Sequence, residues 1–571
     1  MCSLAYQILH RSRSTFLLDL RHFHQRFTGV FGERSGRCIG NKACSGLGPD
    51  DCKRIRGAKV VDQSQHDLSC TDRQACNRIK WDKSSYLTVS GARAVSISST
   101  SDQLRYQAAD TATLAISHVW SHGQGGRPED GLNQCLHQRY CNIAKKFNCT
   151  SYWIDAACIP CDHILRREAI LTINQVFSTS HATILCDRDV MDIDISIIQD
   201  ESDTSDASVA LMESILTIVL VCDWNVRAWT LLEALRGRKN IQLLCKSSGD
   251  NRLISLTDIL RNVTYHGDIS ISILLLTNHH LFPAPGVYHW IKFKTSSREL
   301  PFQSSTFDSS HDAQLTAGRM GRGFITVSEA ASLLGQRFAS RPGDDVIIWS
   351  LLVDDPVRGN AEDLWTRGKD GTRLDQVVYT GHLLSSVQRL PPKSYPRNPS
   401  WAPKQPGPYL AANEKSPISI LYPPYDGSQS RVGTIEIKGF EIKYLRANWG
   451  VASIRFKNKT ASSYRGIHSS GKPMDNEPIP DKLGEYFEGC YDGILLHPLQ
   501  RVGAQGEVEG FEESYANIYG GYRSITKGLL LAVCGRIRMT SSEGTWTWLG
   551  VIDWGDDTTL PYFEEKEILL E

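Results

Sequence analysis

The stretch Trp224-Asn-Val-Arg-Ala-Trp-Thr-Leu-Leu-Glu233 indicates most clearly how this 571-residue chain folds. The apolar residues of this stretch, continued by Leu235, predict an amphipathic helix, because they recur at i, i+3, i+4 and i+7: Ala228, Leu231, Leu232 and Leu235. Trp229 and Glu233 are four residues apart, so the helix places them next to each other beside the apolar face. The stretch therefore predicts a helix that carries a tryptophan and a carboxylate side by side.

Short apolar segments alternate with amphipathic helices around this stretch. The candidate strands are 113–116, 152–154, 182–186 and 241–245. Strands alternating with helices predict right-handed crossovers and a doubly wound parallel sheet, so we interpret residues 111–250 as one small α/β domain. Ligands of such sheets bind beyond the carboxyl ends of the strands. The polar loop 122–126, Asp155 and the Trp229/Glu233 helix are all expected near that edge.

The rest of the chain divides by composition into four further regions. Residues 1–110 are cysteine-rich, lack sustained periodicity and are expected to be partly irregular. Residues 251–388 are predicted to be mainly helical, and the proline-rich segment 389–410 is predicted to be an extended linker. Apolar residues alternate with period two beyond it, which predicts a β-rich domain over 411–571.

Composition narrows the classes of function and location. Hydrophobic residues make up 41% and charged residues 22%, which is ordinary for a globular protein. Lys+Arg and Asp+Glu both number 63, and this zero net charge argues against a nucleic-acid partner. No uninterrupted apolar run approaches the roughly 20 residues of a membrane span. The N-terminus is a poor secretory signal, so we expect a cytoplasmic protein without a membrane span.

The chain has 16 cysteines, which we expect to be mostly free thiols in a reducing compartment. The candidate zinc ligands near the N-terminus are Cys38, Cys44, Cys52, His66, Cys70 and Cys76. Their spacing lacks the CxxC pair that usually marks a zinc site. We therefore expect no metal here, and zinc binding remains the alternative.

Three sequence blocks resemble a known family. They are Leu-Ala-Ile-Ser-His-Val-Trp at 114–120, Tyr-Trp-Ile-Asp-Ala-Ala-Cys-Ile-Pro at 152–160 and Arg-Ala-Trp-Thr-Leu-Leu-Glu at 227–233. In this order and spacing they resemble the fungal heterokaryon-incompatibility (HET) domain. The segments 337–345 and 348–352 are similar to a region that often follows that domain. The resemblance covers about residues 110–355 and leaves out both ends of the chain.

The resemblance implies a fold and a candidate site. HET domains are distant relatives of TIR domains, which have a flavodoxin-like fold, and many TIR domains cleave NAD with a glutamate in a W-C-x-x-E helix. By similarity Glu233 is the candidate catalytic residue, although Thr230 stands where those relatives have cysteine. The candidate nucleotide-binding residues are Ser117, His118, Trp120, Asp155, Arg227 and Trp229.

The resemblance also implies a biological role. It predicts an effector of fungal non-self recognition, innate immunity and programmed cell death, with NAD or a related nucleotide as candidate substrate. It implies no permanently bound cofactor, and it implies self-association and an incompatibility partner protein. The alternative is a non-catalytic, self-assembling module in which Glu233 is structural and pairs with Arg227 or Arg236.

Overall fold

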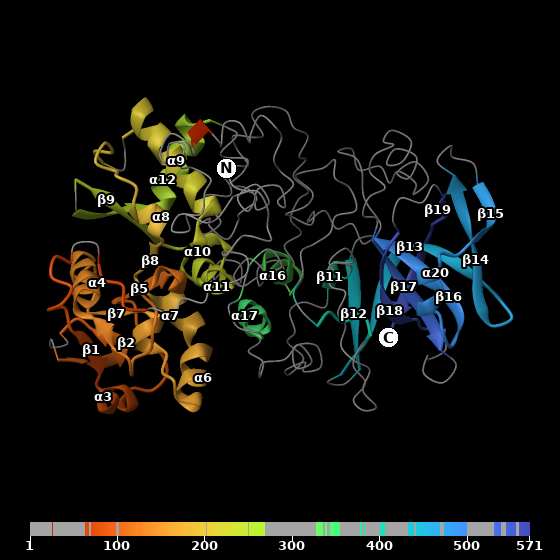
Figure 1. The fold of residues 1–571 in the computed structure, drawn as a ribbon, viewed down its shortest axis with the longest axis horizontal. Helices are drawn as coiled ribbons and strands as arrows, with labels where there is room; N and C mark the ends of the chain where they lie inside the picture. Colours follow the sequence, from red (N-terminus) through yellow and green to blue (C-terminus); the bar gives the residue numbers. More distant parts are fainter. Residues whose placement is uncertain are drawn as a thin grey trace, which may run out of the picture. The chain divides into compact units, whose positions relative to one another are not determined.

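The structure of the protein is a computed structural model, and its chain divides into two compact units (Figure 1). The first consists mainly of residues up to 299 and the second mainly of residues from 343 onward. The residues that the structure describes are 25–26, 63–67, 70–98, 102–200, 203–248, 250–268, 327–334, 337, 339, 343–353, 377–379, 383, 400–404, 406, 432–438, 441–468, 473–498, 530–537, 544–554 and 559–571.

A seven-stranded sheet forms the centre of the first unit. Its order is β10 (Asp250–Ser255), β9 (Ile241–Ser247), β8 (Ala182–Cys186), β5 (Thr113–His118), β7 (Ser151–Trp153), β2 (Arg93–Ser96) and β4 (Tyr106–Ala108). The four strands from β9 to β7 are parallel to one another, whereas β10, β2 and β4 pair antiparallel at the two edges. Every residue of β5 and β8 is buried, as expected of strands covered on both faces.

Helices cover both faces of this sheet. They are α4 (Gln134–Lys146), α5 (Asp155–Cys158), α6 (His163–Leu171), α7 (Ile173–Thr179), α8 (Arg188–Met191), α9 (Asp206–Val221), α10 (Asp223–Val226), α11 (Ala228–Gly237) and α12 (Leu256–His266). Helices α7 and α11 pack together and against β5, and α9 and α12 share a core with β9. Helix α4 packs against β7, where Tyr140 and Tyr152 have ring centroids 5.5 Å apart. The expected mixed α/β architecture is confirmed.

The sheet extends beyond the predicted 111–250 segment at both ends. Strands β2 and β4 come from the region expected to be irregular, and β10 with α12 continues the unit past residue 250. Strands β2 (RAVS) and β4 (YQA) contain polar residues within only four and three positions, so they give no apolar run that would reveal them. The preceding chain adds α3 (Lys83–Thr88) and a small sheet of β1 (Arg78–Trp81), β3 (Gln103–Leu104) and β6 (Leu132–Asn133).

One segment has the length and apolar character of a membrane span. In the part of the chain that the structure describes, only the helical segment Asp206–Val226 passes this test, and 78% of its most apolar window is buried inside the protein. It comprises α9 and α10, whose apolar residues belong to the core shared with β9 and α12. This burial is typical of a core helix, which agrees with the expected absence of a membrane span.

The second unit is β-rich, as predicted. Its sheet runs β11 (Val377–Tyr379), β12 (Val432–Lys438), β13 (Glu441–Lys457), β16 (Cys490–Pro498), β17 (Leu530–Ile537) and β18 (Thr547–Asp553), and the described pairs are antiparallel. Off this path lie β14 (Thr460–His468), β15 (Pro473–Pro478), β19 (Thr559–Pro561) and β20 (Glu564–Leu570). The described helices are α16 (Val327–Leu334), α17 (Asp344–Leu352) and α20 (Asp481–Tyr486).

The predicted linker 389–410 contributes to this second unit where the structure describes it. Trp401 is fully buried, and the backbone N–H of Ser400 donates to the carbonyl oxygen of Glu571 at 3.0 Å. The Ser400 hydroxyl also accepts a hydrogen bond from the N–H of Trp548 at 2.8 Å. This part of the segment is therefore packed structure rather than the extended connector that its prolines predicted.

Candidate functional site

The candidate site lies where the central parallel strands end. In chain order the parallel strands are β5, β7, β8 and β9, and β5 lies between β7 and β8 in the sheet. The connection from β7 to β8 therefore passes over β5. The gap between β5 and β8 is a topological switch point, and ligands of open α/β sheets bind at such points. Ser117 and His118 end β5, Asp155 follows β7, and Asp187 follows β8.

Glu233 is buried beside the end of β5. It is 7% exposed, and its carboxylate accepts a short hydrogen bond from the Ser117 hydroxyl. The same Ser117 oxygen accepts a bond of 2.6 Å from the indole N–H of Trp224, a side chain that is itself fully buried. A continuous chain of hydrogen bonds thus runs from the indole through the serine to the carboxylate. This network fixes the position of Glu233 relative to the strand.

Burial raises the pKa of Glu233 to about 8. Removal from water disfavours the charged form, the hydrogen bond from Ser117 opposes this effect, and the negative charge of Asp155 adds to it. At neutral pH the carboxyl group is therefore largely protonated. A carboxyl group whose pKa lies near physiological pH is suited to proton transfer or to ionisation when a cation arrives.

A second polar cluster surrounds Asp155, the first residue of α5. Its carboxylate accepts from the Nε2 of His118 at 2.6 Å, from the indole N–H of Trp120 and from the N–H of Ala156. Burial alone would raise the pKa of Asp155, but the charge and hydrogen bond of His118, with the other donors, hold it below its usual value. Within the described residues, the buried Nδ1 of His118 has no hydrogen-bond partner.

The two clusters point in different directions from one strand. Neighbouring residues of a strand face opposite sides of the sheet, so Ser117 and His118 diverge. Ser117 faces α11 and Glu233, whereas His118 bonds to Asp155 at the start of α5. The structure thus brings five predicted site residues together around the end of β5: Ser117 with Glu233, and Asp155 with His118 and Trp120.

Asp187 is a buried part of this edge that the sequence analysis missed. Although it begins an acidic stretch of the sequence, it is 0% exposed. Its carboxylate accepts from the N–H of Trp224 at 2.9 Å and lies 4.0 Å from the Nε2 of His122, which also contacts Asp223 at 3.2 Å. The available signal was positional, because Asp187 follows one apolar strand as Asp155 follows another.

Comparisons of the chain with models of protein families, with curated proteins and with solved structures find no match. The interpretation of this site therefore depends on its geometry and on the sequence blocks that form it.

The remaining predicted site residues, Arg227 and Trp229, lie at the start of helix α11. Arg227 caps its N-terminus through its backbone, and its carbonyl oxygen accepts from Arg337 at 3.0 Å. Thr230 is buried, and its hydroxyl lies 2.9 Å from that same oxygen, so it holds the turn between α10 and α11. Trp229 is half-buried one turn before Glu233, as predicted by the spacing. Thr230 thus supports the backbone of this turn.

The close approach of α11 to the sheet depends on Gly237. A Cβ atom at this position would lie 2.0 Å from the Oγ1 of Thr183 on β8. No side chain larger than hydrogen fits there without a shift of the helix or the strand. Gly237 therefore lets α11 pack against the strand whose carboxyl end lies at the candidate site.

The Trp120 side chain holds the polar loop as well as Asp155. The guanidinium carbon of Arg127 lies 5.0 Å from the centre of the Trp120 ring, and a Cβ at Gly125 would lie 2.7 Å from the same ring. The glycine-rich loop is thus packed against the indole. The role of Trp120 that the structure supports is to position Asp155 and this loop.

A group of metal-binding side chains lies outside this site. His66, Cys70 and Cys76, three of the candidate zinc ligands, lie together with Cys135, which the sequence analysis did not include. The other candidates, Cys38, Cys44 and Cys52, lie outside the described residues.

Proposed function

We propose that this protein is a HET-like effector whose α/β unit cleaves NAD or a related nucleotide with Glu233, and that this activity triggers cell death in fungal non-self recognition. The observation that carries the proposal is the buried Glu233 at the switch point of the sheet, held by Ser117 and Trp224. The carboxylate belongs to the helix that the HET resemblance singles out. A cytoplasmic location, self-association and an incompatibility partner belong to the same proposal.

The order of the parallel strands supports a TIR-like interpretation. Numbered along the chain, the strands from β7 to β9 have the spatial order 2-1-3-4. Flavodoxin-like sheets begin with this order and bind their ligand at the switch point beside the first strand. The antiparallel strands β2 and β10 flank this parallel core, so the likeness concerns the four central strands alone.

The chemistry proposed for Glu233 matches its environment. Nicotinamide bonded to ribose in NAD is cationic and leaves as a neutral base, so its departure needs no general acid. The C1′–N bond breaks, its electron pair leaves with nicotinamide, and the ribose develops positive charge that a nearby carboxylate stabilises. Water then adds to C1′ and loses a proton, which gives ADP-ribose.

The positive charge of the substrate would counteract the burial that raises the pKa of Glu233. In the ligand-free protein the group is largely neutral at pH 7, which limits the cost of burying a charge. A cationic nicotinamide ring beside it favours the ionised form, so binding and ionisation are coupled. Arg227 and Trp229 stay proposed contacts for the phosphates and a ring of the nucleotide, and Ser117, His118, Trp120 and Asp155 form the wall of the proposed site.

One observation favours the non-catalytic alternative. Glu233 already accepts a hydrogen bond from Ser117, which is itself satisfied by Trp224, so the network is complete without a ligand. In this alternative Glu233 stabilises the unit, and the protein acts through assembly. The predicted surface pairing of Glu233 with Arg227 or Arg236 does not describe this residue, because its carboxylate is buried against β5.

Expression of the full chain in host cells distinguishes the two functions. We expect wild-type protein to lower the NAD content of the cells before they die, and Glu233→Gln to leave NAD and viability unchanged. Asp250→Asn is the matched control, because Asp250 is an exposed acid on β10 of the same unit. Cell death with intact NAD in cells that express either wild type or Glu233→Gln would reject cleavage and favour assembly.

A further inference from the structure

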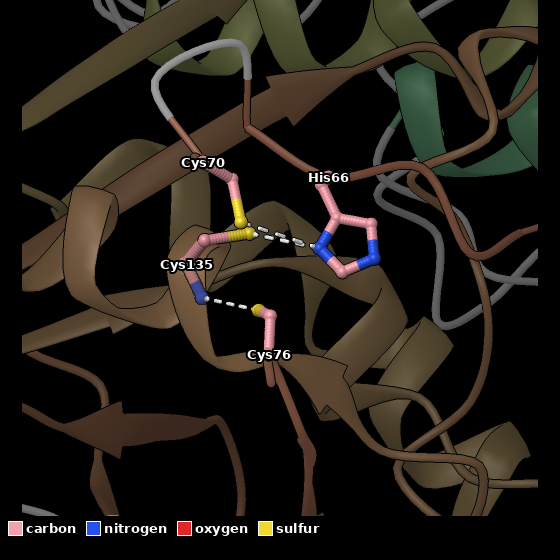
Figure 2. A group of neighbouring side chains, drawn as sticks. All are labelled: His66, Cys70, Cys76 and Cys135. Atoms are coloured by element: carbon pink, nitrogen blue, oxygen red, sulfur yellow. Dashed lines mark hydrogen bonds between the residues drawn. The ribbon is translucent and has the colours of Figure 1, made fainter. Parts of the chain in front are cut away.

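Four side chains from separate parts of the first unit converge on one point. They are His66, Cys70, Cys76 and Cys135, and their nitrogen and sulfur atoms all lie within 4.8 Å of one another (Figure 2). Cys76 lies just before β1, and Cys135 is in the first turn of α4. A set of three thiols and one imidazole is a common ligand set of structural zinc sites.

The two distances from the His66 nitrogen to sulfur atoms of this group match tetrahedral coordination. Zinc–sulfur bonds of about 2.3 Å and zinc–nitrogen bonds of about 2.0–2.1 Å place sulfur and nitrogen roughly 3.6 Å apart in a tetrahedron. The Nδ1 of His66 lies 3.6 Å from the Sγ of Cys70 and 3.6 Å from the Sγ of Cys135. Figure 2 shows the sulfur atoms of Cys70 and Cys135 beside this nitrogen, and the sulfur of Cys76 next to the backbone nitrogen of Cys135.

Backbone donors surround two of the sulfur atoms. The N–H of Asp67 donates to the Sγ of Cys135 at 3.2 Å, and the N–H of Cys135 donates to the Sγ of Cys76 at 3.4 Å. Such outer contacts orient metal ligands.

We propose that His66, Cys70, Cys76 and Cys135 bind one zinc ion as a structural centre. Four protein ligands complete a tetrahedron, so the ion holds the chain together and offers no open position for catalysis. The sequence alone did not predict this set, because the ligands are not arranged as CxxC pairs and Cys135 lies 59 residues after Cys76.

The zinc centre would fix the segment that supports the candidate site. Three residues before His66, the side-chain oxygen of Gln63 accepts from the N–H of Gly125 at 2.5 Å, and its amide donates to the carbonyl oxygen of Trp120 at 3.3 Å. Trp120 in turn donates to Asp155. A metal ion at one end of the 63–67 segment therefore secures the polar loop at the other end.

A buried ion pair reinforces the same connection. Asp67 and Arg139 of α4 lie 2.7 Å apart, and both are almost fully buried. Arg139 also donates to the side-chain oxygen of Gln124 at 3.2 Å, within the polar loop. The segment, the helix and the loop are therefore one hydrogen-bonded assembly beside the zinc ligands.

The test is the metal content of the purified full-length protein, measured by elemental analysis and by native mass spectrometry before and after denaturation. We expect one zinc ion per chain in wild type, its loss in Cys135→Ser and Cys76→Ser, and its retention in Cys161→Ser. Cys161 is an exposed free cysteine of the same unit and is the matched control. Zinc-free wild type that is folded, or full zinc content in Cys135→Ser, would overturn the proposal.

Two measurements on wild type keep the test independent of variant folding. Cobalt exchanged for zinc is expected to give the absorption of a tetrahedral thiolate complex, and bound metal should protect Cys70, Cys76 and Cys135 from alkylation until a chelator is added. Rapid alkylation of these thiols in metal-supplemented native protein would contradict the site. These readouts do not depend on NAD cleavage, so either proposal can fail alone.

Discussion

Glu233→Gln is the substitution whose effect on stability the structure defines most fully. Burial raises the pKa of Glu233 to about 8, whereas the ordinary value is 4.5. Between these values the folded protein binds a proton that the unfolded chain does not bind. The contribution of this group to stability is therefore fully present below pH 4.5 and is lost as the pH rises toward 8. A glutamine in place of Glu233 keeps the shape of the side chain but does not titrate.

The magnitude follows from the width of this pH window. One pH unit inside the window corresponds to about 1.4 kcal/mol of unfolding free energy. Between pH 6 and pH 8 wild type should therefore lose roughly 2 kcal/mol relative to Glu233→Gln, because the folded carboxyl group is only half protonated at its pKa of about 8. Across the whole shift the loss is on the order of 5 kcal/mol, the scale expected for an uncompensated buried charge.

The assay reads the unfolding of the first unit alone. Cys158 and Cys186 are buried free cysteines in this unit, so pulsed alkylation during urea unfolding of the full chain reports its transition by mass spectrometry. Asp250→Asn serves as the control, because the exposed Asp250 leaves the pH dependence of stability unchanged. A stability difference between wild type and Glu233→Gln that stays constant from pH 5 to pH 8.5 would refute the raised pKa.

Two further predictions concern the packing and charge around this site. Gly237→Ala places a Cβ 2.0 Å from the Oγ1 of Thr183, so it should cost about 1–3 kcal/mol of unfolding free energy in the same alkylation assay. An unfolding free energy of Gly237→Ala equal to that of wild type would contradict the clash. Asp155→Asn removes a charge that raises the pKa of Glu233, so the pH-dependent loss of stability should end at a lower pH than in wild type. An unchanged end point would show that the two groups do not interact.

The alternating pattern in the sequence was sufficient to predict the parallel core of the first unit. Apolar segments of three to five residues between amphipathic helices predict a parallel sheet, and the parallel pairing of β5, β7, β8 and β9 confirms it. The edge strands β2 and β4 were not predicted because polar residues interrupt their three or four residues and leave no apolar run. Their pairing depends on tertiary contacts that local sequence does not encode.

Sequence reasoning located the residues of the candidate site but not their hydrogen bonds. The helical spacing placed Glu233 beside Trp229, whereas the structure shows that its partner is Ser117, 116 residues earlier in the chain. The fully buried Asp187 was indistinguishable from its acidic neighbours, because a charge run gives no information about which member is enclosed. The set of Cys135 with His66 likewise required the fold, since the two are 69 residues apart.

The most direct test of the proposed function is nicotinamide release from NAD by the purified full-length protein. Wild type and Asp250→Asn should release nicotinamide and form ADP-ribose at similar rates, and Glu233→Gln should release none above the background of buffer. The rate for wild type should rise with pH through the pKa of Glu233 if the carboxylate form acts. Equal nicotinamide release by wild type and Glu233→Gln, or none from correctly folded wild type under conditions in which it kills cells, would contradict the assignment of Glu233 as the catalytic residue.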